Sequence, residues 1–368
     1  MKKVSIIGCK NYEFETVREK ILESINLLGG LEKFVSPSEN VFVKTNLLAK
    51  RLPEKAVTTH PVFVAAAAHI LMEYGCSVTI GDSPGGPFTQ SALKGIYKTC
   101  GMDFAAEKSG AQLNFNTNTV QVPFEEGKVL KKVTMVEAIH NADKVIDVCK
   151  LKTHSLATFT GGVKNLFGVI PGTMKAEYHL LWPSYNTFAN GLIDICLCVN
   201  PALTLMDGIV GMEGDGPSGG NPRDIGVILA SESPFALDMA AVKIINMPYK
   251  MVPTINQTIK RGIVKPSDVV LVGEDISQFI IEDYKLPKTV IMNPFLRRGK
   301  GNSEKLATDV CFDREKCIGC GVCFDNCPPK AIYMENHRPE VDKTKCIHCY
   351  CCQELCPETA VFAEARLK

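Results

Sequence analysis

The cysteines of this 368-residue chain are concentrated near its C-terminus. Ten of the 16 cysteines lie between Cys311 and Cys356. Eight of them form two copies of the pattern C-x2-C-x2-C-x3-C-P, which begin at Cys317 and Cys346, 29 residues apart. The same offset relates further pairs: Asp313 and Asp342, Lys316 and Lys345, Ala331 and Ala360, and Tyr333 and Phe362. The tail is therefore an internal duplication of one small unit.

This cysteine spacing is typical of bacterial ferredoxins, in which the fourth cysteine of each copy binds the cluster of the other copy. Residues 308–365 resemble a bacterial-type ferredoxin that carries two [4Fe-4S] clusters. The resemblance implies a small, pseudo-symmetric α+β domain of short hairpins and helices. The expected ligand sets are Cys317, Cys320, Cys323 and Cys356 for one cluster, and Cys346, Cys349, Cys352 and Cys327 for the other.

Two cysteines of the tail fall outside the pattern. Cys351 precedes Cys352 and would compete as a ligand if the second loop shifted by one residue, whereas Cys311 is expected to be a packed or free thiol. Zinc is one alternative for the motif cysteines, but zinc sites have no need of a third cysteine at the same step. A disulfide framework is a second alternative, disfavoured in a reducing compartment. Because every expected ligand is a cysteine, no iron is left open, and the tail is expected to relay electrons.

The overall composition disfavours other classes of protein. Lys and Arg total 41 against 40 Asp and Glu, a net charge of +1, which argues against nucleic-acid binding. The sequence after Met1 lacks a secretory signal, and the longest apolar stretches fall short of the roughly 18 residues of a membrane span. We predict a cytoplasmic protein without membrane insertion, whose partner is a redox protein or a small-molecule substrate. The oligomeric state is left open.

Short β-branched runs alternate with segments of helical period over residues 1–296, which predicts a large α/β domain with a mainly parallel sheet, in one lobe or two. The expected strands are Val4–Ile7, Val41–Lys44, Ser77–Ile80, Lys144–Val148, Leu203–Met206, Ile225–Ala230 and Val269–Val272. The expected helices are Glu15–Leu28, Pro61–Tyr74, Thr134–Asn141, Asn186–Val199 and Pro234–Asn246, with Pro61 and Pro234 in the first turn. Residues 297–306 are basic, small and polar, as in a linker, and the ferredoxin domain is expected over 307–368.

Polar residues and glycines are densest where the expected strands end. Cys149–His154 and Thr160–Gly168 follow the expected strand Lys144–Val148, where α/β folds place ligand-binding loops. Glycine-rich turns at residues 81–86 and 207–220 would let a ligand approach the backbone closely. The sequence therefore favours a binding site at this edge of the sheet.

Several short motifs in the first 290 residues resemble the widespread domain-of-unknown-function 362 family. The matching motifs are Val43–Leu47, Thr59–Pro61, Gly81–Ser83, Lys150–His154, Gly161–Asn165 and Asp207–Gly208. Members of this family are often fused to ferredoxin modules in anaerobes. The resemblance implies the large domain and its tail, and it implies no activity.

One segment of the large domain also resembles the nickel-pincer lactate racemase family. The matching residues are His154, Thr160-Gly161-Gly162, Lys164 and Pro171-Gly172. The resemblance implies that His154 is an acid/base residue, that Lys164 is the amine joined to the cofactor, and that His179 lies near a nickel-ligand position. The second catalytic histidine of that family falls near Ser83 or Pro84 here, so the two-sided proton exchange of a racemase is not expected.

These patterns together predict a site in the large domain. His154 and Lys164 are the expected catalytic residues. A substrate, or an additional metal or organic cofactor, is expected to contact Lys44, Asn46, Asp82, Ser83, Lys152, Gly161, Gly162 and His179.

Three functions fit these features. The first is an anaerobic iron–sulfur oxidoreductase, whose clusters relay low-potential electrons to or from a substrate or cofactor in the large domain. The second is an electron-transfer or docking subunit that serves a partner enzyme and has no catalysis of its own. The third is a metal-cofactor isomerase related to lactate racemase.

Overall fold

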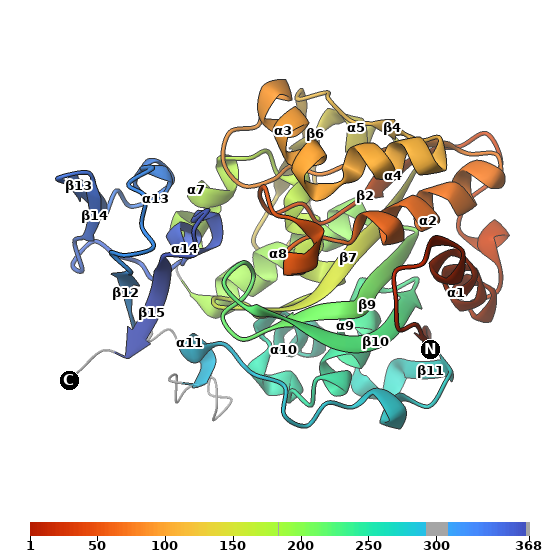
Figure 1. The fold of residues 1–368 in the computed structure, drawn as a ribbon. Helices are drawn as coiled ribbons and strands as arrows, with labels where there is room; N and C mark the ends of the chain where they lie inside the picture. The colour runs from red at the N-terminus through yellow and green to blue at the C-terminus, as the bar shows by residue number, and fades with distance from the viewer. Residues whose placement is uncertain (183, 292–307, 366–368) are drawn as a thin grey trace.

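The computed structural model describes residues 1–182, 184–291 and 308–365. Figure 1 shows a large α/β unit with a small C-terminal unit packed against one side of it. The predicted linker, residues 297–306, lies outside the described residues. Within the described ranges, no helix has both the length and the apolar character needed to cross a membrane.

A nine-stranded, mainly parallel sheet forms the centre of the large unit, as the alternating sequence pattern predicted. Its strands are β1 Lys2–Gly8, β2 Asn40–Lys44, β3 Ser77–Gly81, β4 Gln112–Leu113, β7 Lys144–His154, β8 Thr158–Thr160, β9 Leu203–Glu213, β10 Asn221–Ser231 and β11 Val269–Gly273. The order across the sheet is β11-β1-β10-β9-β7-β2-β3-β4, with β8 paired to β7. The neighbours of β2 are parallel to it, so the carboxyl ends of β2, β3 and β7 lie at the same edge.

Helices cover both faces of the sheet, which explains why its strands are apolar on both sides. One face packs against α1 Phe14–Leu27, α2 Pro61–Glu73, α3 Gln90–Cys100 and α4 Met102–Ser109. The other face packs against α6 Gly162–Asn165, α8 Tyr185–Val199, α9 Pro234–Ile244 and α10 Pro253–Lys260. Pro61 and Pro234 occupy the first turns of α2 and α9, as predicted.

The predicted helix Thr134–Asn141 is wrong. Its first residues belong to β6 Lys132–Val136, which pairs with β5 Thr119–Pro123, and only the four-residue α5 Glu137–His140 is helical. The buried Val133 and Met135 are two residues apart and lie opposite Val122 and Val120, which is the period of a strand. Two further helices of the large unit are α7 Met174–Leu181 and α11 Lys288–Ile291.

The sequence predicts a loop over Cys149–His154, and this prediction is wrong. The segment is the second half of the long strand β7. Pairing continues because β8 folds back along it, with Lys152 opposite Thr160, and because β9 extends beside it. Side chains two residues apart on a strand share a face. Lys150, Lys152 and His154 therefore follow one another along one face of β7.

The C-terminal unit has the pseudo-symmetry that the repeat predicted. It consists of β12 Thr308–Phe312, α13 Val322–Asp325, β13 Ile332–Glu335, β14 Arg338–Val341, α14 Cys351–Leu355 and β15 Val361–Ala365. The Asp313 amide donates to the Ala360 carbonyl over 2.8 Å, and 29 residues later the Asp342 amide donates to the Ala331 carbonyl over 2.7 Å. Residues with positive φ also recur at this offset: Gly319 and His348, Gly321 and Tyr350, and Lys330 and Thr359.

Candidate functional site

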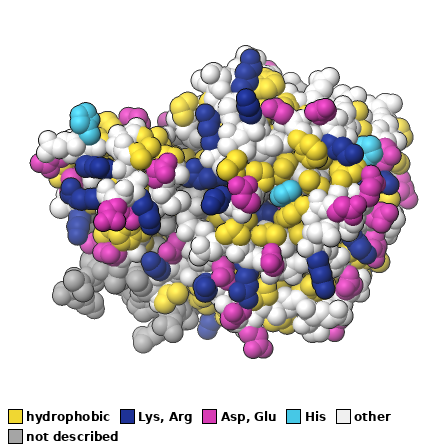
Figure 2. Space-filling view, in the orientation of Figure 1, with side chains coloured by type: hydrophobic (Ala, Val, Ile, Leu, Met, Phe, Trp, Pro, Cys, Tyr) yellow, Lys and Arg dark blue, Asp and Glu magenta, His cyan; other side chains and the backbone are white. Residues whose placement is uncertain are grey.

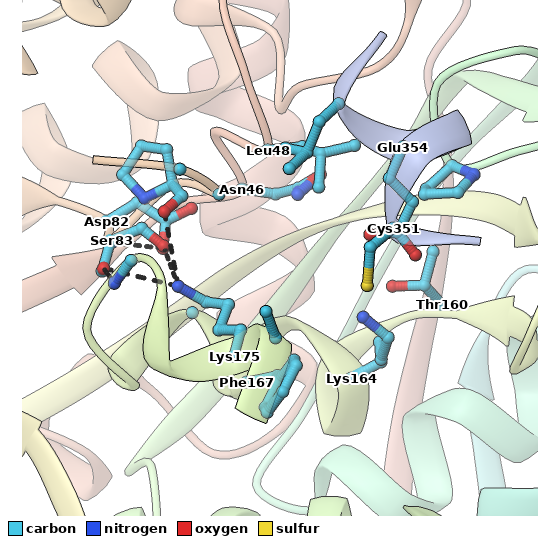
Figure 3. A pocket seen from close by; sticks show the side chains of 18 of the residues that line it. Asn46, Leu48, Asp82, Ser83, Thr160, Lys164, Phe167, Lys175, Cys351 and Glu354 are labelled. Carbon is cyan, nitrogen blue, oxygen red and sulfur yellow. Dashed lines mark hydrogen bonds between the residues drawn. The ribbon is translucent and has the colours of Figure 1, made fainter. Parts of the chain in front are cut away.

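A pocket of about 770 Å³ lies between the large unit and the tail. It is built from the loops that follow β2 and β3, from the segment β7–α6, from α7, and from α14 of the tail (Figure 3). Seven predicted site residues line it: Asn46, Asp82, Ser83, Lys152, His154, Lys164 and His179. The fold thus brings segments that are far apart in the sequence to one cavity.

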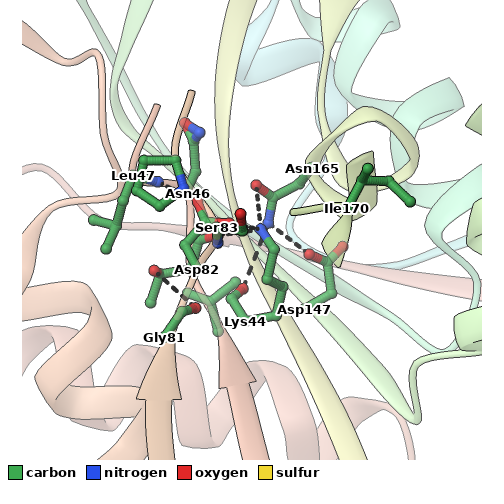
Figure 4. Close-up of polar contacts among 12 residues, drawn as sticks. Lys44, Asn46, Leu47, Gly81, Asp82, Ser83, Asp147, Asn165 and Ile170 are labelled. Atoms are coloured by element: carbon green, nitrogen blue, oxygen red, sulfur yellow. Dashed lines mark hydrogen bonds and ion pairs between the residues drawn. The ribbon is translucent and has the colours of Figure 1, made fainter. Parts of the chain in front are cut away.

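Lys44 lies beneath the pocket, in a buried ion pair with Asp82 (Figure 4). The Lys44 Nζ is 2.8 Å from Asp82 Oδ1, while the other carboxylate oxygen of Asp82 accepts the Leu47 amide over 2.7 Å. A Cβ on Gly168 would lie 2.2 Å from Asp82 Oδ1 and 2.5 Å from Lys44 Nζ. A glycine at position 168 is what allows the backbone to pass over this ion pair, so Lys44 supports the pocket without lining it.

Two lysines that line the pocket direct their ammonium groups to protein oxygens. Lys152 Nζ donates to Asn46 Oδ1 and to the Val57 carbonyl, both over 2.6 Å. Lys175 Nζ donates to the Ser83 carbonyl over 2.6 Å and to the Ile170 carbonyl over 2.7 Å. Burial lowers the pKa of each lysine to about 7. These acceptors favour the ammonium forms, and the two lysines tie together the loops that shape the pocket.

Lys164 differs from these two lysines. Within the described part of the chain, no hydrogen-bond acceptor and no carboxylate is paired with its Nζ, whose recorded contact is the Phe167 ring, 5.1 Å from Nζ to centroid. Figure 3 shows the Lys164 amine directed into the pocket, toward Cys351 and Thr160. Burial lowers the pKa of Lys164, and the nearby Glu354 and Cys351 oppose this change.

His154 is held in one tautomer by contacts on both ring nitrogens. Its Nδ1 accepts the backbone amides of Leu156 and Ala157 over 3.1 and 3.2 Å, which leaves Nε2 as the protonated nitrogen of the neutral ring. Nε2 lies 3.0 Å from Oε1 of Glu354 on α14. Burial lowers the pKa of His154 to about 4, Lys164 adds to this effect, and Glu354 opposes it. The histidine is therefore neutral near pH 7.

His179, the predicted neighbour of a nickel ligand, lines the same pocket from α7. Its ring stacks on Phe188 at 4.7 Å between centroids and meets the edge of Phe167. Burial lowers the pKa of His179 to about 4. Over residues 1–182, 184–291 and 308–365, no three His, Cys, Asp or Glu side chains converge as the ligands of a single metal ion do.

Gly161 and Gly162 lie outside the pocket lining. The amides of Gly162 and Val163 donate to the carboxylate of Asp238, over 2.7 and 3.2 Å. A Cβ on Gly161 would lie 2.2 Å from Asp238 Oδ1. These glycines therefore allow the turn into α6 to pack on Asp238, which places Lys164 in the pocket two residues later.

Helix α14 of the tail connects the pocket with the cysteine-rich loops. Cys351, Glu354 and Leu355 line the pocket, whereas the adjacent Cys352 belongs to the buried core of the tail. Cys351 is also hydrogen-bonded to Cys349 of the second motif. One short helix thus presents a thiol and a carboxylate to the large unit and a cysteine to the interior of the tail.

The cysteines of the first predicted cluster surround one cavity. Cys317, Cys320, Cys323 and Cys356 all line a pocket of about 360 Å³, although Cys356 is far from the other three in sequence. Equivalent backbone donors approach the two fourth cysteines: the Ala331 amide donates to Cys327 Sγ and the Ala360 amide to Cys356 Sγ, each over 3.2 Å. Four cysteine thiols around one cavity are a donor set that suits an iron–sulfur cluster.

Three other family-motif residues, His60, Lys150 and Asp207, form a separate polar cluster with Tyr12, which we call the Tyr12 cluster. Lys150 Nζ is 2.7 Å from Asp207 Oδ2, and the Tyr12 hydroxyl donates to Asp207 Oδ1 over 2.8 Å. The rings of Tyr12 and His60 stack with centroids 3.6 Å apart. None of these four residues lines the pocket.

A groove follows the seam between the two units. Figure 2 shows Lys and Arg side chains at the junction of the tail, at left, with the large unit, and the groove is lined by Arg51, Lys55, Lys288 and Lys316 among others. Arg51 donates to the Cys356 carbonyl, and Ser218 donates to the Gln353 carbonyl over 3.2 Å. These contacts fix the tail beside the pocket.

Sequence reasoning missed three pocket residues of evident chemical interest: Glu354, Lys175 and the pocket-facing position of Cys351. The sequence predicts that the tail is an electron carrier, and this prediction gives no reason for Glu354 and Cys351 to face the large unit. Their spacing, three residues apart on an expected short helix, would have indicated a shared face. Lys175 lies next to the motif Pro171-Gly172, but no local signal marks its contacts with Ser83.

The fold and the site define a class of protein: an α/β unit with a pocket at its sheet edge, closed by an iron–sulfur tail. Residues 316–360 match the 4Fe-4S dicluster domain. The chain belongs to the family described as domain of unknown function (DUF362), whose model matches residues 41–243, more than half of the chain.

Two known proteins are similar to this chain. A thylakoid-associated protein of Synechocystis sp. is 29% identical over 300 residues, which cover 79% of this chain and 89% of that protein. The lactate racemase apoprotein of Thermoanaerobacterium thermosaccharolyticum has 15% sequence identity and a TM-score of 0.43, over 66% of this chain and 55% of that chain.

Proposed function

We propose that this protein is an iron–sulfur oxidoreductase in which two [4Fe-4S] clusters exchange electrons with a substrate or cofactor bound in the pocket. One observation carries the proposal: α14 supplies Cys351 and Glu354 to the pocket and Cys352, a predicted cluster ligand, to the tail. A redox tail that formed a wall of the pocket would deliver electrons directly beside the bound molecule.

The proposal assigns one cluster to Cys317, Cys320, Cys323 and Cys356, and the other to Cys346, Cys349, Cys352 and Cys327. The cavity shared by the first set supports this assignment, and the pseudo-symmetry of the tail extends it to the second set. Each cluster carries one electron at a time. Two reduced clusters therefore hold the electron pair that a two-electron reduction of one substrate consumes.

The two clusters have different surroundings, which suggests a direction for the relay. Cys320 is exposed, and the neighbouring Ile318 is 64% exposed. Cys352 is buried next to the pocket-facing Cys351. In the proposed route, a single-electron carrier protein exchanges electrons at the first cluster, and the second cluster exchanges them with the pocket.

The side chains of the pocket supply proton transfer and positioning. His154 is neutral and holds its Nε2 beside the ionised Glu354, so this pair can accept a proton from a substrate that is oxidised in the pocket. In this proposal His154 takes part in proton transfer, and Lys164 contacts the bound molecule. The proposal places the protein in a reducing compartment, the cytoplasm, where the cysteine thiols remain available as ligands.

The test follows the oxidation state of the clusters. Anaerobically purified protein is reduced with dithionite, freed of excess reductant and mixed with a protein-free small-molecule fraction of the source cells, while cluster absorbance is recorded. We expect reoxidation by the wild type, loss of this reaction in His154→Gln, and no change in Lys55→Met, whose lysine lies in the seam groove. Iron content must be equal in the three proteins.

Other outcomes would favour the other two functions. If small molecules fail to reoxidise the clusters while a stable partner protein does so equally in His154→Gln, the protein is a docking subunit. If a substrate is converted at the same rate after the clusters are removed, it is an isomerase. Either result would overturn the oxidoreductase proposal.

A further inference from the structure

The charged side chains that line the pocket differ in whether a protein group is paired with them. Asp82 is paired with Lys44, and Glu354 is in contact with His154. Lys152 and Lys175 donate to protein oxygens. Within the described residues, Lys164 is thus the charged group of the lining that faces the cavity without an ion-pair or hydrogen-bond partner.

Lys164 is partly exposed to the space of the pocket, and among the described residues its Nζ has no ion-pair or hydrogen-bond partner. A ligand that brought a negative charge to Nζ would gain an ion pair without displacing a protein partner. The space above the amine is the interior of the pocket, between Cys351 and Thr160, so the missing partner can come from a bound molecule.

The other lining residues indicate the chemistry of the rest of the ligand. Leu48 and Phe167 of the large unit and Leu355 of the tail present apolar surface to the same cavity. Apolar walls with a small number of placed polar groups are typical of sites for small organic molecules.

The number of free donors decides between kinds of anion. A phosphate group carries close to two negative charges and is usually bound by several donors. Here one lysine ammonium of the described lining lacks a protein partner, so the pocket offers one cationic donor rather than several. A singly charged carboxylate matches this arrangement.

We propose that the pocket binds a small organic acid whose carboxylate pairs with Lys164 Nζ and whose apolar part contacts Phe167, Leu48 and Leu355. This proposal rests on the proposed function, because the bound acid would be the molecule that exchanges electrons with the clusters. The pairing itself involves no electron transfer and can be tested separately.

The experiment compares acids with their uncharged amides by titration calorimetry on the anaerobically purified, cluster-containing protein. The probe pairs are butyrate with butyramide and benzoate with benzamide, and methyl phosphate represents the phosphate class. We expect each acid to bind about ten-fold or more tightly than its amide, because a hydrogen-bonded ion pair has this order of strength. Lys164→Met should abolish the difference, and Lys164→Arg should retain most of it.

Lys55→Met is the matched control, because Lys55 is exposed in the seam groove, and it should behave as the wild type. Equal binding of acid and amide, an unchanged preference in Lys164→Met, or no binding of any probe would overturn the proposal. Tighter binding of methyl phosphate would overturn the choice of carboxylate. An acid preference without any substrate-dependent cluster reoxidation would refute the proposed function and leave the carboxylate site standing.

Discussion

The Nε2 of His154 lies 3.0 Å from the Oε1 of Glu354, and the two side chains come from opposite partners of the interface between the large unit and the tail. This contact joins strand β7 of the central sheet to helix α14 of the dicluster domain. The backbone amides on Nδ1 set the tautomer of the imidazole, and the Glu354 contact on the other side of the ring closes one side of the pocket. The pair is therefore the first place to test both the stability and the chemistry of the site.

Replacing Glu354 by alanine should destabilise the protein by about 1–3 kcal/mol, because it removes the carboxylate that lies 3.0 Å from the buried His154 Nε2. Glu354→Gln should cost less, since it keeps the size of the side chain. The midpoint of urea unfolding, measured by circular dichroism on iron-matched samples, checks both changes. Glu335→Ala on the exposed β13–β14 hairpin is the control. Equal stability of Glu354→Ala and Glu335→Ala would contradict the role of the contact.

Buried histidines should make folding less favourable on mild acidification. The buried carboxyls of Asp147 and Asp238, whose pKa values burial raises to about 7 and about 8, contribute in the opposite direction. Burial lowers the folded-state pKa of His154 and of His179 from 6.5 to about 4, so the folded protein resists protonation of these rings while the unfolded chain accepts protons. The neutral rings favour folding above pH 6.5, and this contribution is lost progressively as the pH falls from 6.5 toward 4. Unfolding midpoints measured across this range check the prediction.

The histidine variants provide the comparison for this pH dependence. His179→Phe should flatten the decline between pH 6.5 and 4, because it removes one ring that is protonated only on unfolding. His140→Gln, at an exposed histidine, should leave the curve unchanged. A decline of the same steepness in His179→Phe would refute the assignment.

Cys351 and Cys311 are the two cysteines of the tail outside the motifs, and they should differ in effect. Cys351 is hydrogen-bonded to Cys349, whereas Cys311 contacts Glu364 at the edge of the β12–β15 pair. Hydrogen bonds to cluster sulfurs tune the reduction potential. Cys351→Ala should therefore shift one of the two reduced-cluster signals in electron paramagnetic resonance to lower potential, with full iron content. Cys311→Ala should shift neither.

Loss of about half the iron in Cys351→Ala would show instead that Cys351 is a cluster ligand in place of Cys352. Cys320→Ser shows how much iron is lost when a predicted ligand is removed. That substitution removes a predicted ligand, and iron should fall from about eight to about four atoms per chain. Unchanged iron and unchanged reduced-state spectra in Cys320→Ser would refute the ligand assignment.

Gly168→Ala should disrupt the pocket from below. The added Cβ would occupy the space of Asp82 Oδ1 and Lys44 Nζ, so the buried ion pair must separate or the backbone must move. Breaking a buried pair of this kind costs about 3–5 kcal/mol. Thermal unfolding of the variant measures the loss, and a change within about 0.5 kcal/mol, as at an ordinary surface position, would argue against it.

The parts of this molecule that could be predicted are those with local causes. Ligand spacing in the cysteine motifs is set by the chain itself, so the pseudo-symmetric tail followed from the 29-residue repeat. Alternating apolar segments gave the sheet and most of its helices, because both faces of the sheet are covered. Motif residues such as Asp82 and Lys164 could be expected in one pocket because the parallel strands β2, β3 and β7 end at one edge.

The parts that could not be predicted depend on contacts between distant segments. The strand β7 continues through Lys150 and His154 because β8 and β9 pair with it. The sequence around these residues does not indicate that pairing. The helix predicted over 134–141 was wrong for the same reason, because its first residues pair with β5 in a hairpin. Glu354 lies 200 residues from His154 in sequence, and only the docking of the tail makes them neighbours.

Because α14 belongs to the tail and also lines the pocket, the tail cannot be exchanged without changing the pocket. A tail that served only as an electron carrier could be lost or exchanged for another redox module without changing what the large unit recognises. Here such an exchange would remove Cys351, Glu354 and Leu355 from the pocket at the same time. A large unit of this fold without the tail would need other residues to complete the same pocket, so a change in the tail is also a change in the pocket.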